Sequence, residues 1–217
     1  MKFEHTEVFN FEGALRGMRN PLESWDKSDS GISREPLNFD FEIGGNDSEL
    51  ACKLIKAGEP HRKFLRQIFV SVDITAPLYW WKEFDTYKVG TTANSTSTMH
   101  KLASTPITLN CFEMDDFENV GIEDDIGWGV IECWKSLIKD LEILRLKYNE
   151  TKDKRYWKEL IRLLPESWLQ KRTITMNYEN ILNMVKYREN HKLTEWSVSF
   201  MEWVKSLPYA NEFIFYK

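Results

Sequence analysis

Short segments of strand-like pattern occupy the first half of the chain. In these segments hydrophobic and polar residues alternate, or β-branched and aromatic residues gather between Gly, Pro, Asn and Asp. The alternation is weak near the N-terminus and clear in "NFDFEIG". We predict strands at residues 2–11, 38–44, 64–75 and 105–114.

Helical periodicity lies between these strands and dominates the second half of the chain. The helix before the third strand has Asn46 or Asp47 as its cap and Gly58 as its stop, and the next helix follows Pro77 and ends near Gly90. We predict helices at residues 12–19, 46–58, 77–88, 129–148, 152–165, 177–188 and 192–207, a long loop at 20–36, and a strand or an extended connection at 171–177.

Large apolar side chains recur on one face of several predicted helices, and we expect them to form the core. They are Trp80, Trp81 and Phe84, then Val130, Trp134, Leu137, Leu141, Leu144 and Tyr148, and finally Leu193, Trp196, Phe200, Trp203 and Leu207. Strands in the first half and helices in the second predict an α+β fold, with helices packed on a small, mainly antiparallel sheet and a helical C-terminal half. No repeat or linker interrupts the pattern, so we expect a single domain over residues 1–217.

Composition sets the broad class. The chain has 217 residues, of which 42% are hydrophobic and 14% aromatic, enough for a buried core. No apolar run is long enough to cross a bilayer and the N-terminus lacks the pattern of a secretory signal, so we expect a soluble cytoplasmic protein without a membrane partner. Cys52, Cys111 and Cys133 are widely spaced and form no CxxC pair, so we expect three small buried hydrophobes in a reducing compartment rather than disulfides or a zinc site.

Charge narrows the possible partners. A net charge of −5 argues against a nucleic-acid polymer, which would need a basic stripe, but it leaves room for a single nucleotide in a pocket with a few cations. The acidic segment at residues 115–125 lacks the regular carboxylate spacing of a hard-metal site. We therefore interpret it as a solvated loop that leads into a helix N-terminus, and we predict no metal.

No Gly-rich phosphate loop, GxSxG or HExxH motif is present, so function depends on looser groups of residues. The first group is a row of polar side chains along one side of the predicted helix at 177–188. Two interpretations are open: the row hydrogen-bonds a flat heterocycle, or it consists of a capping Asn, solvent-facing amides and cations that favour the helix end. The residues are Asn177, Asn180, Asn183, Tyr187, Arg188 and His191.

The second group is the stretch "APLYWWKEFDTYKVGTTANSTSTMHK", in which six of the eight residues from Thr91 to Thr98 carry a hydroxyl. It is compatible with a flexible linker, with an exposed strand, or with a site that once held more highly charged residues.

Residues 64–99 resemble the signature region of the flavin-dependent thymidylate synthases (ThyX). That family has a strand, an Ala-Pro type junction, an aromatic-rich helix and the motif RHRxxSxNExSxR. Lys88 keeps a cation, Thr91 and Thr96 keep hydroxyls, and a one-residue slip would instead match Asn94 and Ser97. Without a gap from Ala76-Pro77, the motif falls on Thr86, Tyr87, Lys88, Thr91, Ala93, Asn94, Thr96 and Thr98.

The C-terminal half resembles the same family. Its members carry an LP dipeptide, a helix of form NxR, then Asn, Arg, His and Glu. Glu179 stands here in the place of the NxR arginine. The matching residues, in order, are Leu164, Pro165, Asn177, Asn183, Arg188, His191 and Glu195.

The resemblance implies a ThyX-like homotetramer in which subunits share an FAD site. NADPH reduces FAD, and a one-carbon unit passes from methylenetetrahydrofolate to C5 of dUMP without an enzyme nucleophile. Arg188 would be catalytic by polarising the uracil ring. By resemblance, the cofactor ligands are Tyr87, Lys88, Asn177, Asn183, Arg188 and His191. The nucleotide ligands are Glu83, Thr91, Asn94, Thr96, Ser97 and Thr98.

The residues that differ from the family's motif lie mainly at positions that bind dUMP in the family. Thr98, for example, replaces an arginine that binds the phosphate. We therefore expect a divergent, flavin-binding relative whose nucleotide pocket is remodelled, with either an altered pyrimidine nucleotide as substrate or cations from elsewhere, such as Arg16, Arg19 or Arg62. The alternative is a catalytically inactive nucleotide-binding or interaction protein that kept the fold.

Overall fold

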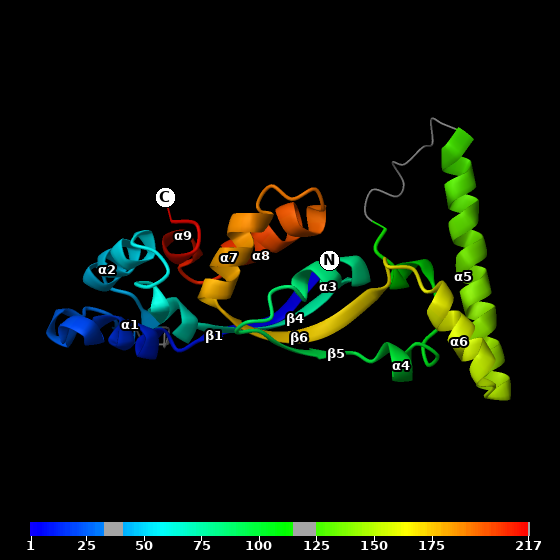
Figure 1. The fold of residues 1–217 in the computed structure, drawn as a ribbon, viewed down its shortest axis with the longest axis horizontal. Helices are drawn as coiled ribbons and strands as arrows, with labels where there is room; N and C mark the ends of the chain where they lie inside the picture. Colours follow the sequence, from blue (N-terminus) through cyan, green and yellow to red (C-terminus); the bar gives the residue numbers. More distant parts are fainter. Residues whose placement is uncertain (33–40, 115–124, 217) are drawn as a thin grey trace. The chain divides into compact units, whose positions relative to one another are not determined.

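The computed structural model describes residues 1–32, 41–114 and 125–216 (Figure 1). The predicted α+β class is confirmed. The larger sheet has the strand order β1-β4-β6-β5, and β2 pairs antiparallel with β3. The strands are β1 (Lys2–Phe9), β2 (Gly31–Ile32), β3 (Phe41–Glu42), β4 (Phe69–Pro77), β5 (Thr92–Ser95) and β6 (Leu169–Asn177).

Strands β4 and β6 run antiparallel. At one end the N–H of Leu78 donates to the carbonyl of Trp168, and at the other the N–H of Tyr178 donates to the carbonyl of Ile68. Along β4 every second side chain is buried, which follows from the β-branched and aromatic residues that predicted this strand. Helix α7 (Tyr178–Arg188) starts where β6 ends.

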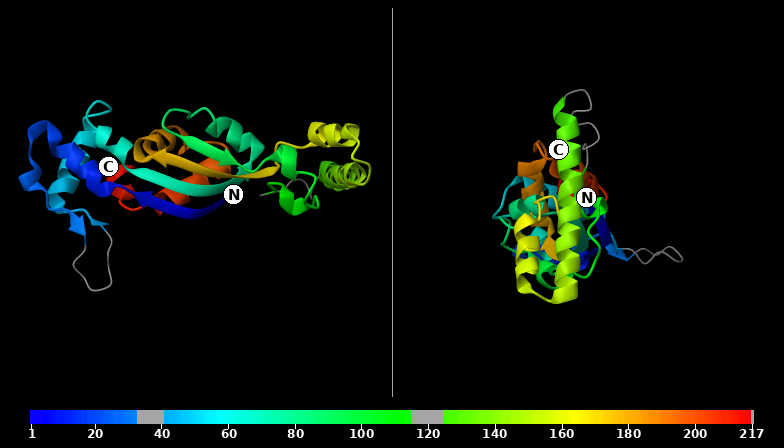
Figure 2. Two further views of the ribbon diagram at one scale, coloured as in Figure 1. Left: turned by 90° about the horizontal axis from the view of Figure 1, so that it is seen from below. Right: turned by 90° about the vertical axis from the view of Figure 1, so that its right-hand side faces the viewer.

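The chain divides into two compact units. Unit 1 comprises Met1, Thr75–Asp85 and Asn94–Arg172. Its helical elements are α3 (Leu78–Phe84), α4 (Thr98–Lys101), the 3₁₀ turn η4 (Leu109–Cys111), α5 (Asp125–Thr151) and α6 (Lys154–Leu163). Helices α5 and α6 lie side by side in this unit (Figure 2), over a core of Leu102, Ile107, Phe112, Leu141 and Leu160.

Unit 2 comprises Lys2–Ile74, Thr86–Ala93 and Thr173–Lys217. Its core is rich in aromatic rings: Phe11 packs edge-on against Tyr178 and Tyr209, and Phe200 packs against Trp196 and Trp203. Its helical elements are α1 (Phe11–Arg19), the 3₁₀ turns η1 (Asn20–Leu22), η2 (Trp25–Lys27) and η3 (Lys63–Gln67), α2 (Gly45–Lys56), α7, the π-helix η6 (Glu195–Phe200), α8 (Met201–Lys205) and α9 (Ala210–Phe213).

Two predicted strands are wrong in whole or in part. Residues 105–114 form η4 and a single bridge between Phe112 and Trp168, because Ile107 and Phe112 both pack into the core of unit 1. Residues 63–67 form η3 rather than the start of β4. Phe64 and Leu65 are adjacent and both buried, which a helical turn permits and a strand with one covered face does not.

Three smaller expectations are also corrected. Helix α3 ends at Phe84, not near Gly90. The cap of α2 is Gly44, and the carboxylate of Asp29 accepts the N–H groups of Asn46 and Asp47 from outside the helix. The cysteines are not all buried, because Cys133 is exposed and the other two are half-buried.

The acidic segment at residues 115–124 lies outside the described residues, as do residues 38–40 of the predicted second strand. Among the helices that the structure describes, none is both long and apolar enough to cross a membrane. Within the same described ranges, no three His, Cys, Asp or Glu side chains are grouped so that they could hold a metal ion.

Candidate functional site

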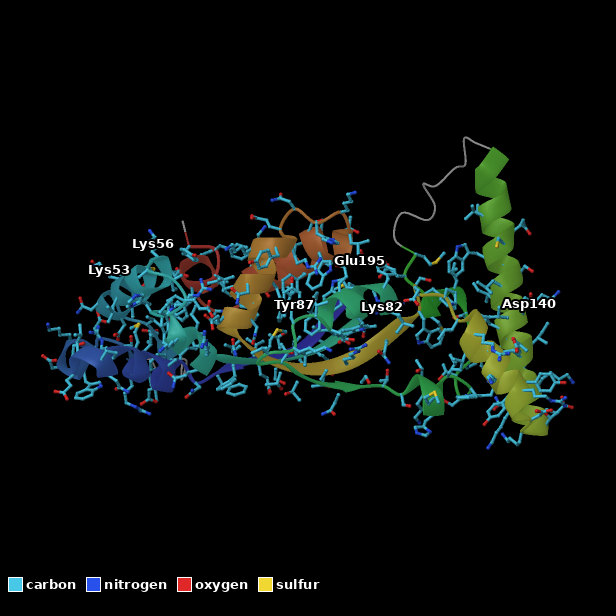
Figure 3. All side chains as sticks on the ribbon, viewed as in Figure 1. Lys53, Lys56, Lys82, Tyr87, Asp140 and Glu195 are labelled. Carbon is cyan, nitrogen blue, oxygen red and sulfur yellow. The ribbon has the colours of Figure 1, made fainter. Side chains whose placement is uncertain are left out.

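An arginine packed against two aromatic rings lies in unit 2. Arg188 is the last residue of α7, and its Nε donates to the Tyr87 hydroxyl at 3.0 Å. The guanidinium carbon is 4.9 Å from the ring centre of Trp196 and 5.6 Å from that of Tyr87. Trp196 is fully buried, so it forms a rigid face for the half-exposed cation. We call Tyr87, Arg188 and Trp196 the arginine cluster. Of these three residues, Figure 3 labels Tyr87.

His191 adjoins this cluster, as the sequence predicts. Its backbone N–H donates to the carbonyl of Arg188 at 3.1 Å, which continues the turn that ends α7. Its Nδ1 accepts the N–H of Leu193 at 3.2 Å. In the neutral imidazole the proton therefore resides on Nε2, and the ring orientation is fixed by the backbone of its own turn.

The row of amides on α7 serves the protein itself. Asn177 and Asn180 form a reciprocal capping box, in which each side chain accepts the other's backbone N–H, at 3.0 and 3.2 Å. Asn180 also donates to the carbonyl of Val89 at 2.7 Å, and Asn183 accepts from Arg62 at 3.1 Å. The capping interpretation is confirmed for Asn177, but Asn180 and Asn183 are not simply solvent-facing.

Gly90 permits the loop before β5 to approach α7 closely. Its φ is +79°, and a Cβ at this position would lie 3.0 Å from the amides of both Asn177 and Asn180. Only glycine meets both conditions without strain. The close approach lets the carbonyl of Val89 accept the hydrogen bond from Asn180. Val89 is two residues after Tyr87, so this bond ties the loop that follows Tyr87 to α7.

A buried carboxylate pairs with two arginines near the start of α7. Glu179 is 6% exposed and accepts from Arg62 Nε at 3.2 Å and from Arg66 Nε in a shorter contact. Arg66 also pairs with Glu59. The hydrogen bond to Glu179 raises the pKa of Arg66 above its ordinary value. No local spacing in the sequence predicts this network.

The three arginines considered as replacement phosphate ligands have different surroundings. Arg62 pairs with Glu179, and Arg19 forms a buried pair with Asp47. Arg16 is exposed and makes no ion pair with a described residue. Among these three, Arg16 alone retains a charge that no described carboxylate offsets.

The hydroxyl stretch is an ordered part of the structure. Thr92–Ser95 form the edge strand β5, in which all four residues are exposed. The exposed-strand interpretation is therefore confirmed, and the flexible-linker interpretation is wrong. In unit 2, Lys88 is exposed and Thr91 donates to the carbonyl of Tyr87 at 2.5 Å.

The other predicted nucleotide ligands lie in unit 1. The N–H of Thr96 donates to the carbonyl of Lys171 at 2.9 Å, and the Ser97 hydroxyl accepts the N–H of His100 and so caps α4. Thr98 opens α4. Asn94 is exposed in β5, and Glu83 is half-buried in α3. Their roles as nucleotide ligands stay predictions.

Solved structures with closely similar folds exist. Flavin-dependent thymidylate synthase ThyX from Helicobacter pylori, complexed with FAD and dUMP, has a TM-score of 0.69 and 16% identity over 99% of this chain and 98% of that one. A second structure of that synthase with FAD and dUMP gives a TM-score of 0.68 and 16% identity, over 99% of this chain and 97% of that one. This chain has the ThyX fold. No protein family model matches the sequence, and no curated protein matches it.

The residues of unit 2 fit only part of the contacts that FAD would need by resemblance to ThyX. The arginine cluster offers a planar cation with a phenol, beside the imidazole of His191, and these groups suit the edge of a flavin or uracil ring. Asn177 fits less well because its oxygen already caps α7. The fit therefore rests on Arg188, Tyr87 and His191 rather than on the amide row.

Proposed function

We propose that the protein is a flavin-dependent, thymidylate-synthase-like enzyme, which carries out reductive one-carbon transfer to C5 of a pyrimidine nucleotide. The nucleotide is dUMP or an altered relative of it. The arginine cluster carries this proposal, because it presents a fixed guanidinium on a chain with the ThyX fold. By resemblance, the assembly is a homotetramer, and NADPH and methylenetetrahydrofolate are co-substrates.

Bound FAD would supply the redox chemistry, and the protein's part is orientation and charge. The planar fork of Arg188 would hydrogen-bond the carbonyl edge of the base and so favour negative charge that develops on its oxygen. Tyr87 and Trp196 fix the guanidinium plane. By resemblance, Lys88 and the hydroxyl of Thr91, which also belong to unit 2, would line the rest of the nucleotide.

A second candidate function is supported by the charge network. Glu179 stands where the family has an arginine, and it pairs with Arg62 and Arg66. Thr98 stands where the family has the phosphate arginine. Arginines that pair with a carboxylate of the protein are less able to bind a substrate. This pairing supports a ThyX-fold protein that binds nucleotides without catalysing the reaction.

The visible spectrum of the purified protein, with and without added FAD, tests the proposal. We expect a flavin absorption band that is lost in Arg188→Ala and weakened in Asn183→Ala. Arg188→Lys should retain only part of it, because lysine keeps the charge without the planar fork. A protein that stays colourless after incubation with FAD would exclude the flavoenzyme and leave the non-catalytic candidate.

Arg172→Ala is the matched control for Arg188→Ala. Arg172 also stacks on a tryptophan, with its guanidinium carbon 4.2 Å from the ring centre of Trp81, and donates to Asp85 at 2.8 Å. It lies in unit 1 and has no proposed role in flavin binding. If Arg172→Ala removed the band as completely as Arg188→Ala, the loss would reflect general damage rather than a lost flavin contact.

A further inference from the structure

A cavity of about 430 Å³ lies beside α1 in unit 2, and it shares no residue with the arginine cluster. Its wall includes Glu12, Arg16, Trp25, Ser28, Ile32 and Phe41. A second hollow of about 360 Å³ shares Glu12, Arg16, Ile32 and Phe41 with it. The volume is within the range of small-molecule sites, roughly 300–1,000 Å³.

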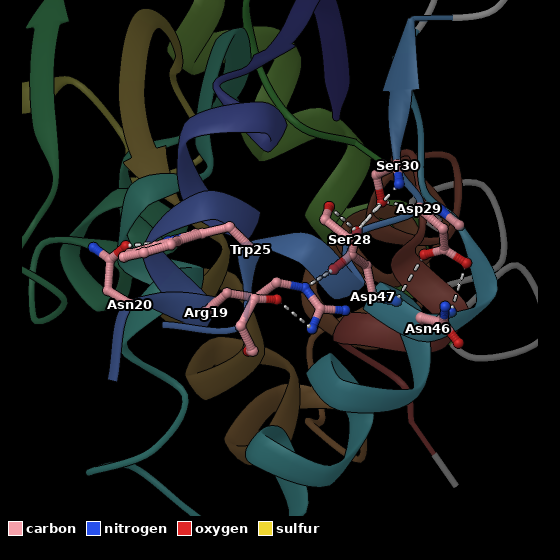
Figure 4. Close-up of polar contacts among 10 residues, drawn as sticks. Arg19, Asn20, Trp25, Ser28, Asp29, Ser30, Asn46 and Asp47 are labelled. Atoms are coloured by element: carbon pink, nitrogen blue, oxygen red, sulfur yellow. Dashed lines mark hydrogen bonds and ion pairs between the residues drawn. The ribbon is translucent and has the colours of Figure 1, made fainter. Parts of the chain in front are cut away.

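Three residues of the cavity wall, Arg19, Ser28 and Ser30, are held by one buried carboxylate behind it. Asp47 is fully buried and accepts from Arg19 at 2.5 Å, from the Ser28 hydroxyl at 2.7 Å and from the Ser30 hydroxyl at 2.6 Å (Figure 4). The Ser30 hydroxyl in turn accepts the N–H of Gly44 at 3.0 Å. These contacts hold Ser28 and Ser30 in place, and Asp47 balances the charge of Arg19.

Two charged side chains of the wall are not used in this way. Glu12 and Arg16 are one turn apart on α1 and both are exposed, yet neither makes an ion pair with a described residue. An isolated arginine is suited to bidentate contact with a phosphate. An isolated carboxylate accepts hydrogen bonds from ring N–H and exocyclic amino groups.

The aromatic part of the wall is held in place although it is open to solvent. Trp25 is 49% exposed, and its Nε1 donates to the side chain of Asn20 at 2.9 Å, which fixes the plane of the indole (Figure 4). Phe41 and the 63% exposed Ile32 add further apolar surface. An oriented, half-exposed indole offers a stacking face for a planar heterocycle.

We infer that this cavity binds a nucleoside monophosphate whose base presents N–H donors, as guanine does. The base stacks on Trp25 and donates to Glu12, and the phosphate pairs with Arg16. Within the described residues of the wall, Arg16 is the one cation that makes no ion pair, and one such cation matches one phosphate group rather than a polymer backbone, in agreement with the net charge of −5. The inference does not depend on the proposed flavin chemistry.

Calorimetric titration of the full-length protein with GMP tests this inference. We expect saturable binding, with a Kd raised at least tenfold by Arg16→Ala and raised also by Glu12→Gln and Trp25→Leu. Guanosine should bind more weakly than GMP, and inorganic phosphate alone more weakly still. The three substituted residues are exposed, and circular dichroism checks that each variant is folded.

Two control variants separate this site from others. Lys56→Ala removes an exposed cation from α2, where Figure 3 shows it, and should leave the GMP affinity unchanged. Arg188→Ala should do the same. No GMP binding, binding that Arg16→Ala leaves intact, or equal affinity for phosphate and GMP would each overturn the inference. Loss of GMP binding in Arg188→Ala alone would move the ligand to the arginine cluster. A colourless protein would refute the flavin proposal and leave these expectations in place.

Discussion

At the scale of single residues, the buried ion pair of Arg19 and Asp47 stabilises the fold because each side chain balances the buried charge of the other. Both side chains are almost fully buried, with 4% and 0% exposed. Asp47→Ala would leave a buried guanidinium without its counter-charge, so we expect a loss of about 3–5 kcal/mol in the free energy of unfolding. Urea unfolding at pH 7 measures it. Asp47→Asn, which keeps the size of the side chain but removes its charge, is the control. Its free energy of unfolding should lie between those of the natural protein and Asp47→Ala.

The same pair predicts a pH dependence. Burial raises the pKa of Asp47, but hydrogen bonds from Ser30, Ser28 and Arg19 together outweigh it, so the pKa lies below its ordinary value. A lowered pKa means that the stabilisation is complete above the unfolded-state value of about 3.9 and is lost as the pH falls through the folded-state value. The stability gap between the natural protein and Asp47→Asn should therefore narrow in acid. An equal gap at pH 7 and pH 3 would contradict this account.

At the scale of elements, the start of α7 depends on the loop that carries Gly90. Gly90→Ala introduces both a strained left-handed φ and a Cβ only 3.0 Å from the amides of Asn177 and Asn180. Gly58→Ala is the matched control, because its φ is also positive, +99°, but nothing lies within 4 Å of the added Cβ. The strain alone costs roughly 1–2 kcal/mol. We expect Gly90→Ala to lower the urea midpoint more than Gly58→Ala does, and equal losses would show that the close approach is unimportant.

The sequence predicts elements best where one periodic face meets the core. The helix predicted at 129–148 is present as α5, and the one predicted at 177–188 is α7, because apolar residues three and four apart need no distant partner to be recognised. The carboxylate that accepts the first N–H groups of α2 could not be predicted, since Asp29 supplies it from another loop. Residues 105–114 have strand composition, but packing against the core of unit 1 overrides it.

In the candidate site, too, local spacing predicts some neighbours, whereas contacts between distant residues are not predicted. The sequence places Arg188 and His191 together because they are three positions apart on one turn. It gives no sign that Glu179 pairs with Arg62, which is 117 positions away, or that Trp196 faces Arg188 rather than only the core. Such contacts depend on tertiary packing, which local spacing does not encode.

At the scale of the whole molecule, this chain shares the ThyX fold with a solved synthase to which it is only 16% identical. The buried aromatic and aliphatic positions are enough to specify the architecture, because cores tolerate extensive apolar exchange. Function depends on fewer residues, so fold and activity can separate. The flavin spectrum is consequently more informative about this protein than any further comparison of folds.

The two compact units raise the question of whether the chain is one cooperative domain. Strands β4, β5 and β6 each place residues in both units, so neither unit can lose its strands without breaking elements of the other. We therefore expect a single calorimetric transition, with a calorimetric enthalpy equal to the van't Hoff enthalpy. A repeated scan checks reversibility, without which the comparison has no meaning. Two resolved transitions would instead show that the units unfold independently, and the expectation of one domain over residues 1–217 would be wrong.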